Sequence, residues 1–186
     1  IRNYDFSPML YDARLVLTNP DNGYATVGFS QQIIGRLDGM NEKGLVVGLH
    51  FVNNEERAEG FFATTIVRML LEQCANIEEA IQFITTVPHG YCYNYSITDR
   101  SGKSIIVEAA PDRQMIIDAD PLVCTNHFET ESLRDWNRND VQLQGSLARK
   151  RHVHALLKQD YTTTELFHHF NDGESPLFFH HYREFF

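Results

Sequence analysis

The sequence has little of what marks several large classes of protein. It contains only three cysteines in 186 residues, widely spaced and without a CxxC pair, which argues against a disulfide framework and excludes a zinc ribbon. No apolar run approaches the roughly 20 residues that span a bilayer. Basic residues are also scarce: 16 Lys and Arg stand against 25 Asp and Glu, a net charge of −9 that would repel a polyanion. We therefore expect reduced thiols and a cytoplasmic protein that binds neither membrane nor nucleic acid.

The common catalytic and nucleotide-binding motifs are missing as well. The sequence has no HExxH, GxxxxGK[ST], GxGxxG or GxSxG pattern. Histidines occur in pairs at 152 and 154, 168 and 169, and 180 and 181, without an accompanying Cys or carboxylate cluster. Neighbouring side chains on a helix point about 100° apart, so the adjacent pairs are poorly arranged for a single ion. We expect no metal and no cofactor.

What the sequence does contain is an ordinary globular composition, with 42% apolar and 22% charged residues. Segments with strand character lie at 13–20, 24–30, 31–52 (two strands around a turn at 38–44), 92–99, 103–110, 114–120 and 122–128. Segments with helical character lie at 61–74, 76–87, 146–159 and 162–170. Capping boxes begin the second and fourth helices, at Asn76 and Thr162. The order strands, helices, strands, helices predicts an α+β protein in which helices cover antiparallel sheets.

Four short stretches stand out, and each has an ordinary structural explanation. They are RNYD at 2–5, GMNEKGLVVGLHF at 39–51, CTNHF at 124–128 and SLARKR at 146–151. Arg2 and Asp5 could form a structural ion pair, and MNEKG could be only a turn. Asn126 could bond its own backbone, and Arg149 could be one solvated helix charge among several.

In this order and at these spacings, the four stretches together resemble one family. The chain resembles N-terminal-nucleophile (Ntn) amidohydrolases of the choloylglycine hydrolase and penicillin acylase type. The branch that it resembles contains the acyl-coenzyme A:6-aminopenicillanic acid acyltransferases and related linear-amide hydrolases. The resemblance runs from residue 1 to about residue 157. It implies an αββα four-layer sandwich with two antiparallel sheets, formed by residues 1–186 as a single domain that we expect to be truncated at both ends.

The resemblance implies a cysteine nucleophile that is the first residue of the mature chain. None of Cys74, Cys92 and Cys124 lies at a matching position. The nucleophile is therefore expected upstream of Ile1. A free α-amine has a pKa near 7.7–8.0 and can shuttle a proton at neutral pH, so such a residue would combine thiol and base.

The resemblance also assigns roles to five residues of this sequence. Arg2 is expected beside the thiol, where its charge favours the thiolate, and Asp5 is expected to hold the α-amine. The oxyanion hole is expected from the side-chain amide of Asn126 and the backbone N–H of His50. Arg149 matches a helix-borne arginine near the nucleophile.

Two of these positions leave alternatives open. The ring of His50 either lines the substrate pocket and titrates near neutrality, or is packed in the core with only its backbone functional. Bile-salt hydrolases tend to carry asparagine at this place and penicillin V acylases tyrosine, so His50 weakens both assignments. At the arginine position, Arg151 is an alternative to Arg149.

The expected function is hydrolysis of the C–N bond of a small linear amide through an acyl-enzyme. Acyl transfer to an amine uses the same machinery, and a noncatalytic ligand-binding relative is the alternative from another class. The aromatic segment 177–186 is expected to be core or subunit interface, which leaves a homo-oligomer open.

Overall fold

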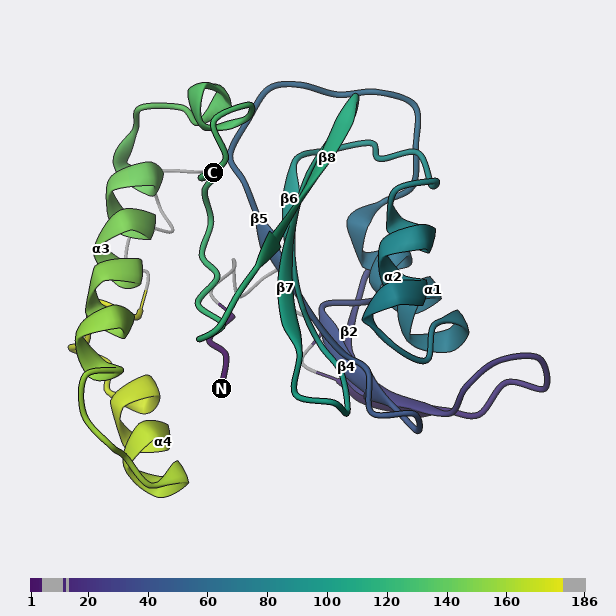
Figure 1. The fold of residues 1–186 in the computed structure, drawn as a ribbon, viewed down its shortest axis with the longest axis horizontal. Helices are drawn as coiled ribbons and strands as arrows, with labels where there is room; N and C mark the ends of the chain where they lie inside the picture. Colours follow the sequence, from purple (N-terminus) through teal and green to yellow (C-terminus); the bar gives the residue numbers. More distant parts are fainter. Residues whose placement is uncertain (5–11, 13, 179–186) are drawn as a thin grey trace.

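An antiparallel sheet forms the centre of the molecule (Figure 1). The computed structural model describes residues 1–4, 12 and 14–178. The strands are β1 Leu15–Thr18, β2 Thr26–Gln31, β3 Gly35–Arg36, β4 Asp38–Asn41, β5 Val46–Phe51, β6 Tyr93–Thr98, β7 Ser104–Ala110 and β8 Arg113–Asp118. They lie in the order β1-β2-β4-β5-β6-β7-β8, with β3 paired to β2 beside this path. The pairings between these strands are antiparallel.

Helices lie on both sides of the sheet (Figure 1). Helices α1 Ala63–Gln73 and α2 Ile77–Ile84 cover one face, and α3 Val141–Leu156 and α4 Thr163–Asn171 lie on the other side. A short 3₁₀ helix, η2 Arg134–Trp136, precedes α3. None of the described helices is long and apolar enough to cross a membrane.

The main hydrophobic core lies between the sheet and α1 and α2. Val47 and Leu49 of β5 and Ile66 and Leu70 of α1 belong to one buried cluster that also includes residues of α2, β6 and β7. Successive residues of a strand point to opposite faces. The residues between the core positions therefore face α3, and these include His50 and Gly48 of β5.

Extended segments occupy the layer between the sheet and α3. Figure 1 shows the N-terminus and the chain after β8 running through this layer. The second sheet of the expected sandwich would lie here, but residues 119–128 form no strand in the described part of the chain. The α+β class with antiparallel pairing and outer helices is confirmed.

The predicted strand at 122–128 is therefore wrong, and the reason lies in its hydrogen-bond partners. The carbonyls of Thr125 and His127 accept hydrogen bonds from the side chain of Asn94, and the N–H of Asn126 donates to the Ser146 hydroxyl. Side chains satisfy the polar backbone that a neighbouring strand would otherwise pair. A pattern of apolar residues cannot reveal such partners.

The remaining elements follow the predictions closely, with three corrections. Residues 31–37 were expected to form one strand, but they form the end of β2, a turn at 32–34 in which Gln32 and Ile33 have positive φ angles, and the two-residue strand β3. The predicted turn at 38–44 is too long, because Asp38–Asn41 forms β4 and only the residues after it turn. Helix α3 begins five residues early, capped by Asp140, which accepts from the N–H of Leu143. The N-caps at Asn76 and Thr162 are both confirmed. Asp5, His180, His181 and most of the aromatic segment 177–186 lie outside the described residues.

Candidate active site

Arg2 reaches from the N-terminus across β4 and β5. Its Nη1 donates to the Asp38 carboxylate, 2.5 Å away, and to the Leu37 carbonyl at 3.2 Å, while Nη2 donates to the Leu49 carbonyl at 2.5 Å. Three hydrogen bonds thus hold the guanidinium, while its buried Nε–H has no partner among the described residues. Asp38 was not foreseen as a partner, because its position was assigned to a turn.

His50 lies on the same strand, facing α3. Its Nε2 lies 3.0 Å from the hydroxyl of Ser96 on β6. Burial, and secondarily the charge of Arg2, lower the pKa of His50 from 6.5 to about 3. The ring is therefore neutral at physiological pH, and the suggestion that it titrates near neutrality is wrong.

Asn126 lies in the extended segment between the sheet and α3, next to the end of β5. Its Nδ2 donates to the carbonyl of Phe51 at 2.9 Å, and its Oδ1 accepts from Nη2 of Arg149 at 3.0 Å. An amide nitrogen carries two hydrogens. The second N–H of Asn126 has no partner in the part of the chain that the structure describes. This polar donor lies on a half-exposed side chain.

Strand β5 brings four of the five expected site residues together. The carbonyl of Leu49 holds Arg2, the carbonyl of Phe51 holds Asn126, and His50 lies between these two positions in the chain. Arg149 joins the group through Asn126, although more than a hundred residues separate it from Arg2. Asp5 is outside the described residues, so its place relative to the group stays a prediction.

Arg151, the alternative to Arg149, is exposed on α3. The hydrogen bond to Asn126 comes from Arg149.

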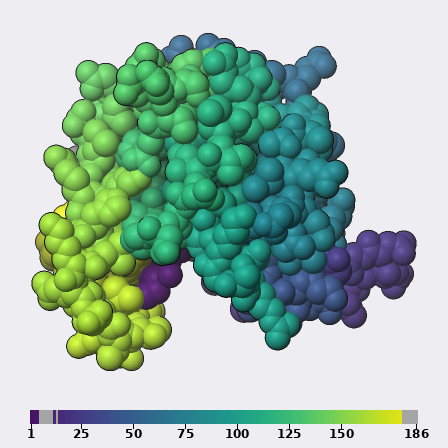
Figure 2. All heavy atoms as spheres, in the orientation of Figure 1, coloured from purple at the N-terminus to yellow at the C-terminus, as the bar shows by residue number. Residues whose placement is uncertain are grey.

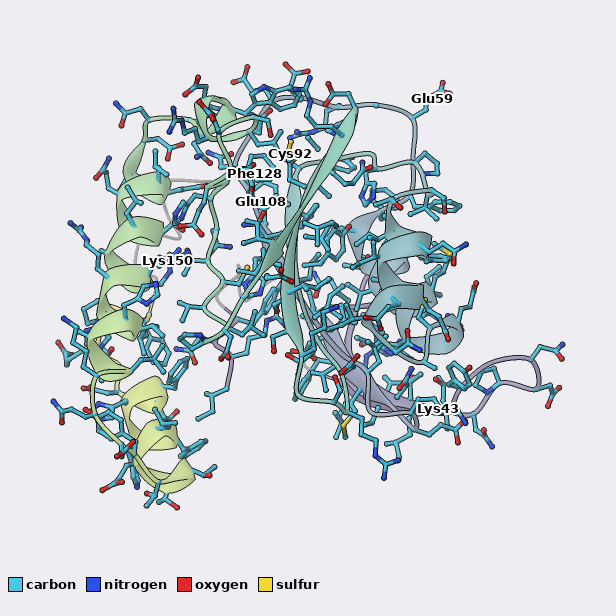
Figure 3. All side chains as sticks on the ribbon, in the orientation of Figure 1. Lys43, Glu59, Cys92, Glu108, Phe128 and Lys150 are labelled. Atoms are coloured by element: carbon cyan, nitrogen blue, oxygen red, sulfur yellow. The ribbon has the colours of Figure 1, made fainter. Side chains whose placement is uncertain are left out.

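Charged side chains surround the backbone just after Asn126 (Figure 3). The Glu108 carboxylate on β7 is buried and accepts from the N–H of Glu129 at 2.5 Å and from Thr130. Lys150 on α3 pairs with the carboxylate of Glu129. His127 and Lys150 lower the pKa of Glu129 to about 2. The sheet and α3 therefore both bind this segment.

The three cysteines are free thiols with raised pKa values. Burial raises the pKa of Cys74 to about 12 and that of Cys92 to about 11, and it also raises the pKa of Cys124. Because the thiolate is the reactive form, none of these thiols suits a nucleophile at neutral pH.

No group of three or more His, Cys, Asp or Glu side chains is placed to hold a metal ion within residues 1–4, 12 and 14–178.

The N-terminal residues are partly open to solvent: Figure 2 shows dark purple atoms in a hollow between the yellow-green helices and the teal strands. Asn3 fixes this segment to α4 by donating to the carbonyl of Phe170 at 3.0 Å.

Two solved structures share the fold of this chain. A conjugated bile acid hydrolase from Clostridium perfringens is 17% identical, with a TM-score of 0.55 over 78% of this chain and 62% of that one. An N-acylethanolamine-hydrolyzing acid amidase ortholog from Caenorhabditis elegans is 15% identical, with a TM-score of 0.58 over 93% of this chain and 80% of that one. The fold is thus that of the Ntn hydrolases, as the resemblance implied. This chain spans only 62% of the length of the bile acid hydrolase.

The sequence itself identifies the family. The model of the acyl-coenzyme A:6-aminopenicillanic acid acyl-transferase family matches residues 1–186, so the chain belongs to that family. A search of curated proteins found no match.

Proposed function

We propose that this chain carries most of the active site of a hydrolase that cleaves linear amide C–N bonds through an acyl-enzyme. The observation that carries the proposal is the grouping of Arg2, His50, Asn126 and Arg149 around one end of β5. The names of the two similar structures, a bile acid hydrolase and an acid amidase, support amide cleavage.

Asn126 would stabilise the oxyanion. Its unused N–H is a neutral donor, and such a donor contributes about 3–4 kcal/mol to transition-state stabilisation in acyl transfer. Arg149 bonds the other end of the same amide and draws electron density toward Oδ1. A more polarised amide donates more strongly. The backbone N–H of His50, which the resemblance offered as the second donor, does not suit that role. His50 is paired with Asn94 across β5 and β6, and the N–H of Val52, two residues on, donates to Cys92 on the β6 side, so the N–H of His50 points into the same ladder.

The nucleophile would be an N-terminal cysteine that precedes Ile1 in the natural protein. Cys74, Cys92 and Cys124 are poor candidates because burial raises their pKa values. The unused Nε of Arg2 would favour the thiolate by charge and by hydrogen bonding. Asp5 would hold the α-amine that serves as base.

Acyl transfer to an amine is the second candidate, because it shares the acyl-enzyme and gives the family its name. Water resolves the acyl-enzyme in a hydrolase, whereas an amine resolves it in a transferase. Adding an amine acceptor to the reaction and measuring the ratio of new amide to free acid separates the two.

The test of the proposal is alkylation of the full-length protein by iodoacetamide, followed by mass mapping and assay with a panel of acyl p-nitroanilides. We expect loss of activity to track labelling of a cysteine upstream of Ile1. The single variants C74S, C92S and C124S should keep most activity. Inactivation that tracks labelling of Cys92 or Cys124 would contradict the mechanism. A full-length protein without an N-terminal cysteine and without amide turnover would instead indicate a noncatalytic ligand-binding relative.

A further inference from the structure

Asn94 holds the backbone on both sides of Asn126. It lies on β6, opposite His50 on one side and Glu108 on the other. Its Nδ2 donates to the carbonyl of Thr125 at 3.0 Å and to the carbonyl of His127 at 2.8 Å. Both carbonyls belong to the residues that flank Asn126, so a single side chain fixes the peptide groups around it.

Ser146 holds the same point of the chain from the other side. It is fully buried on α3, and its hydroxyl accepts from the backbone N–H of Asn126 at 2.8 Å. The ring of His127 lies 2.8 Å from the same hydroxyl. Asn126 is therefore fastened to the sheet through Asn94 and to α3 through Ser146.

General packing does not account for an asparagine at position 94. The side chain is 2% exposed, and its Oδ1 is buried without a hydrogen-bond partner in the described part of the chain. A buried acceptor without a partner destabilises the folded protein. The side chain is explained by what its Nδ2 does, which is to hold a segment that lacks strand partners of its own.

We propose that Asn94 and Ser146 are positioning residues that fix the amide of Asn126 for oxyanion binding, an inference that rests on the proposed function. The oxyanion donor must be aimed before the reaction begins, since reorientation during the reaction would cancel much of its effect. Asn126 lies outside any helix or strand, so the position of its backbone depends on Asn94 and Ser146, while Phe51 and Arg149 bond the two ends of its amide.

The chain offers a matched control in Asn41. Asn41 is also buried, and its Nδ2 also donates to two backbone carbonyls, those of Leu71 at 2.9 Å and Cys74 at 2.7 Å. These carbonyls lie at the end of α1, on the other side of the sheet from Asn126. The variants N94A and N41A therefore both remove an amide that donates to two backbone carbonyls, and only the first of these amides adjoins Asn126. N41A also removes two bonds that Oδ1 of Asn41 accepts, from the N–H groups of Lys43 and Leu45, so it is the more disruptive of the two variants for the fold.

The experiment compares N94A, N41A, N126A and the double variant N94A/N126A in the full-length protein. We expect N94A to lower kcat by about tenfold to a hundredfold with KM nearly unchanged, as for a misplaced catalytic group. N41A should keep kcat in its folded fraction. In the N126A background, N94A should have no further effect on kcat, because it acts through Asn126. An N94A variant that behaves like N41A, or whose effect adds fully to that of N126A, overturns the inference.

A second readout separates this inference from the proposed function. The side-chain amide signal of Asn126, assigned by its loss in N126A, should shift or broaden in the ¹H–¹⁵N spectrum of N94A but not of N41A. An unchanged signal in N94A overturns the inference whatever the activity. If N126A keeps full amide turnover, the proposed function fails, while this signal still decides whether Asn94 positions Asn126.

The variant S146A covers the case in which N94A does not fold. Replacing a buried helical serine with alanine removes only a hydroxyl, and alanine favours the helix. We expect S146A to lower kcat and to speed hydrogen exchange of the Asn126 backbone amide. Unchanged kcat together with unchanged exchange overturns the inference.

Discussion

Nη2 of Arg149 donates a hydrogen bond of 3.0 Å to the side-chain oxygen of Asn126. This contact fixes the positions of Oδ1 and Nδ2 in the Asn126 amide, because a guanidinium can only donate and its partner must be the oxygen. The amide oxygen must face α3, and the Nδ2 must face the end of β5. The donor end of Asn126 is therefore the end that lies nearest to the strand carrying His50.

Arg149→Lys tests this contact. Lysine keeps the charge but cannot reproduce the planar geometry of the guanidinium. A hydrogen bond to a charged group contributes about 1.5–3 kcal/mol, so we expect kcat/KM to fall roughly tenfold to a hundredfold. The control is Arg151→Lys on the exposed face of the same helix, which should leave kcat/KM unchanged. Equal effects of the two substitutions would contradict the assignment of Arg149.

Asn126→Asp tests the donor alone. The carboxylate has almost the same shape and still accepts from Arg149, but it cannot donate to an oxyanion. We expect a loss of about 10²–10³ in kcat. The ion pair with Arg149 should preserve much of the melting temperature, measured by circular dichroism. Asn126→Leu should lower kcat by a similar factor, and a leucine variant with wild-type kcat would rule out the oxyanion role.

Asp38→Asn tests the anchor of Arg2. The carboxylate of Asp38 accepts from Arg2 at 2.5 Å and also from the N–H of Phe29 at 3.2 Å. Both side chains of the pair are only partly exposed, so we expect a loss of about 1 kcal/mol in the free energy of unfolding, measured in urea, together with lower kcat. The control is Glu78→Gln, which breaks the exposed pair with Lys103 and should not change kcat. Wild-type kcat in Asp38→Asn would show that Arg2 needs no anchor.

His50→Gln tests the neutral ring through the pH dependence of stability. The pKa of His50 is lowered from 6.5 to about 3 by burial and by Arg2. The unfolded chain therefore binds the proton more readily, and wild-type stability should fall as the pH drops from 6.5 toward 3. The slope from this group is at most about 1.4 kcal/mol per pH unit.

Glutamine does not titrate, so His50→Gln lacks this contribution. The difference in the free energy of unfolding between the two proteins, measured in urea, should be constant above pH 6.5 and should change in favour of His50→Gln below it. A difference that stays constant down to pH 4 would contradict a depressed pKa for His50.

Local patterns in the sequence predicted most of the elements. Capping boxes and helical periodicity predicted α1, α2 and α4 to within three residues at each end, because these signals depend on interactions three or four positions apart. The hairpin between β6 and β7 was equally clear from its turn residues. The segment 122–128 was misread as a strand, since its polar backbone is satisfied by Asn94 and Ser146 from distant parts of the chain.

In the candidate site too, some residues were predicted from the sequence and others were found only in the structure. Four motifs in a fixed order indicated Arg2, His50, Asn126 and Arg149, and the family match confirms the resemblance that they carried. The four motifs assigned no role to Asp38, Asn94 or Ser146, because each acts on a residue at least twenty positions away. The pKa of His50 was also hidden, since it depends on burial and on the approach of Arg2.

The sequence by itself thus determined the class of fold, the family and the kinds of group that the site would contain. These follow from short-range patterns and from motifs that keep their order along the chain. Only the tertiary structure decided which arginine meets Asn126, which hydrogen of the Asn126 amide has no partner among the described residues, and whether His50 carries a charge. Those properties depend on distances of about 3 Å between groups far apart in the chain and on the exclusion of water around them, which folding alone creates.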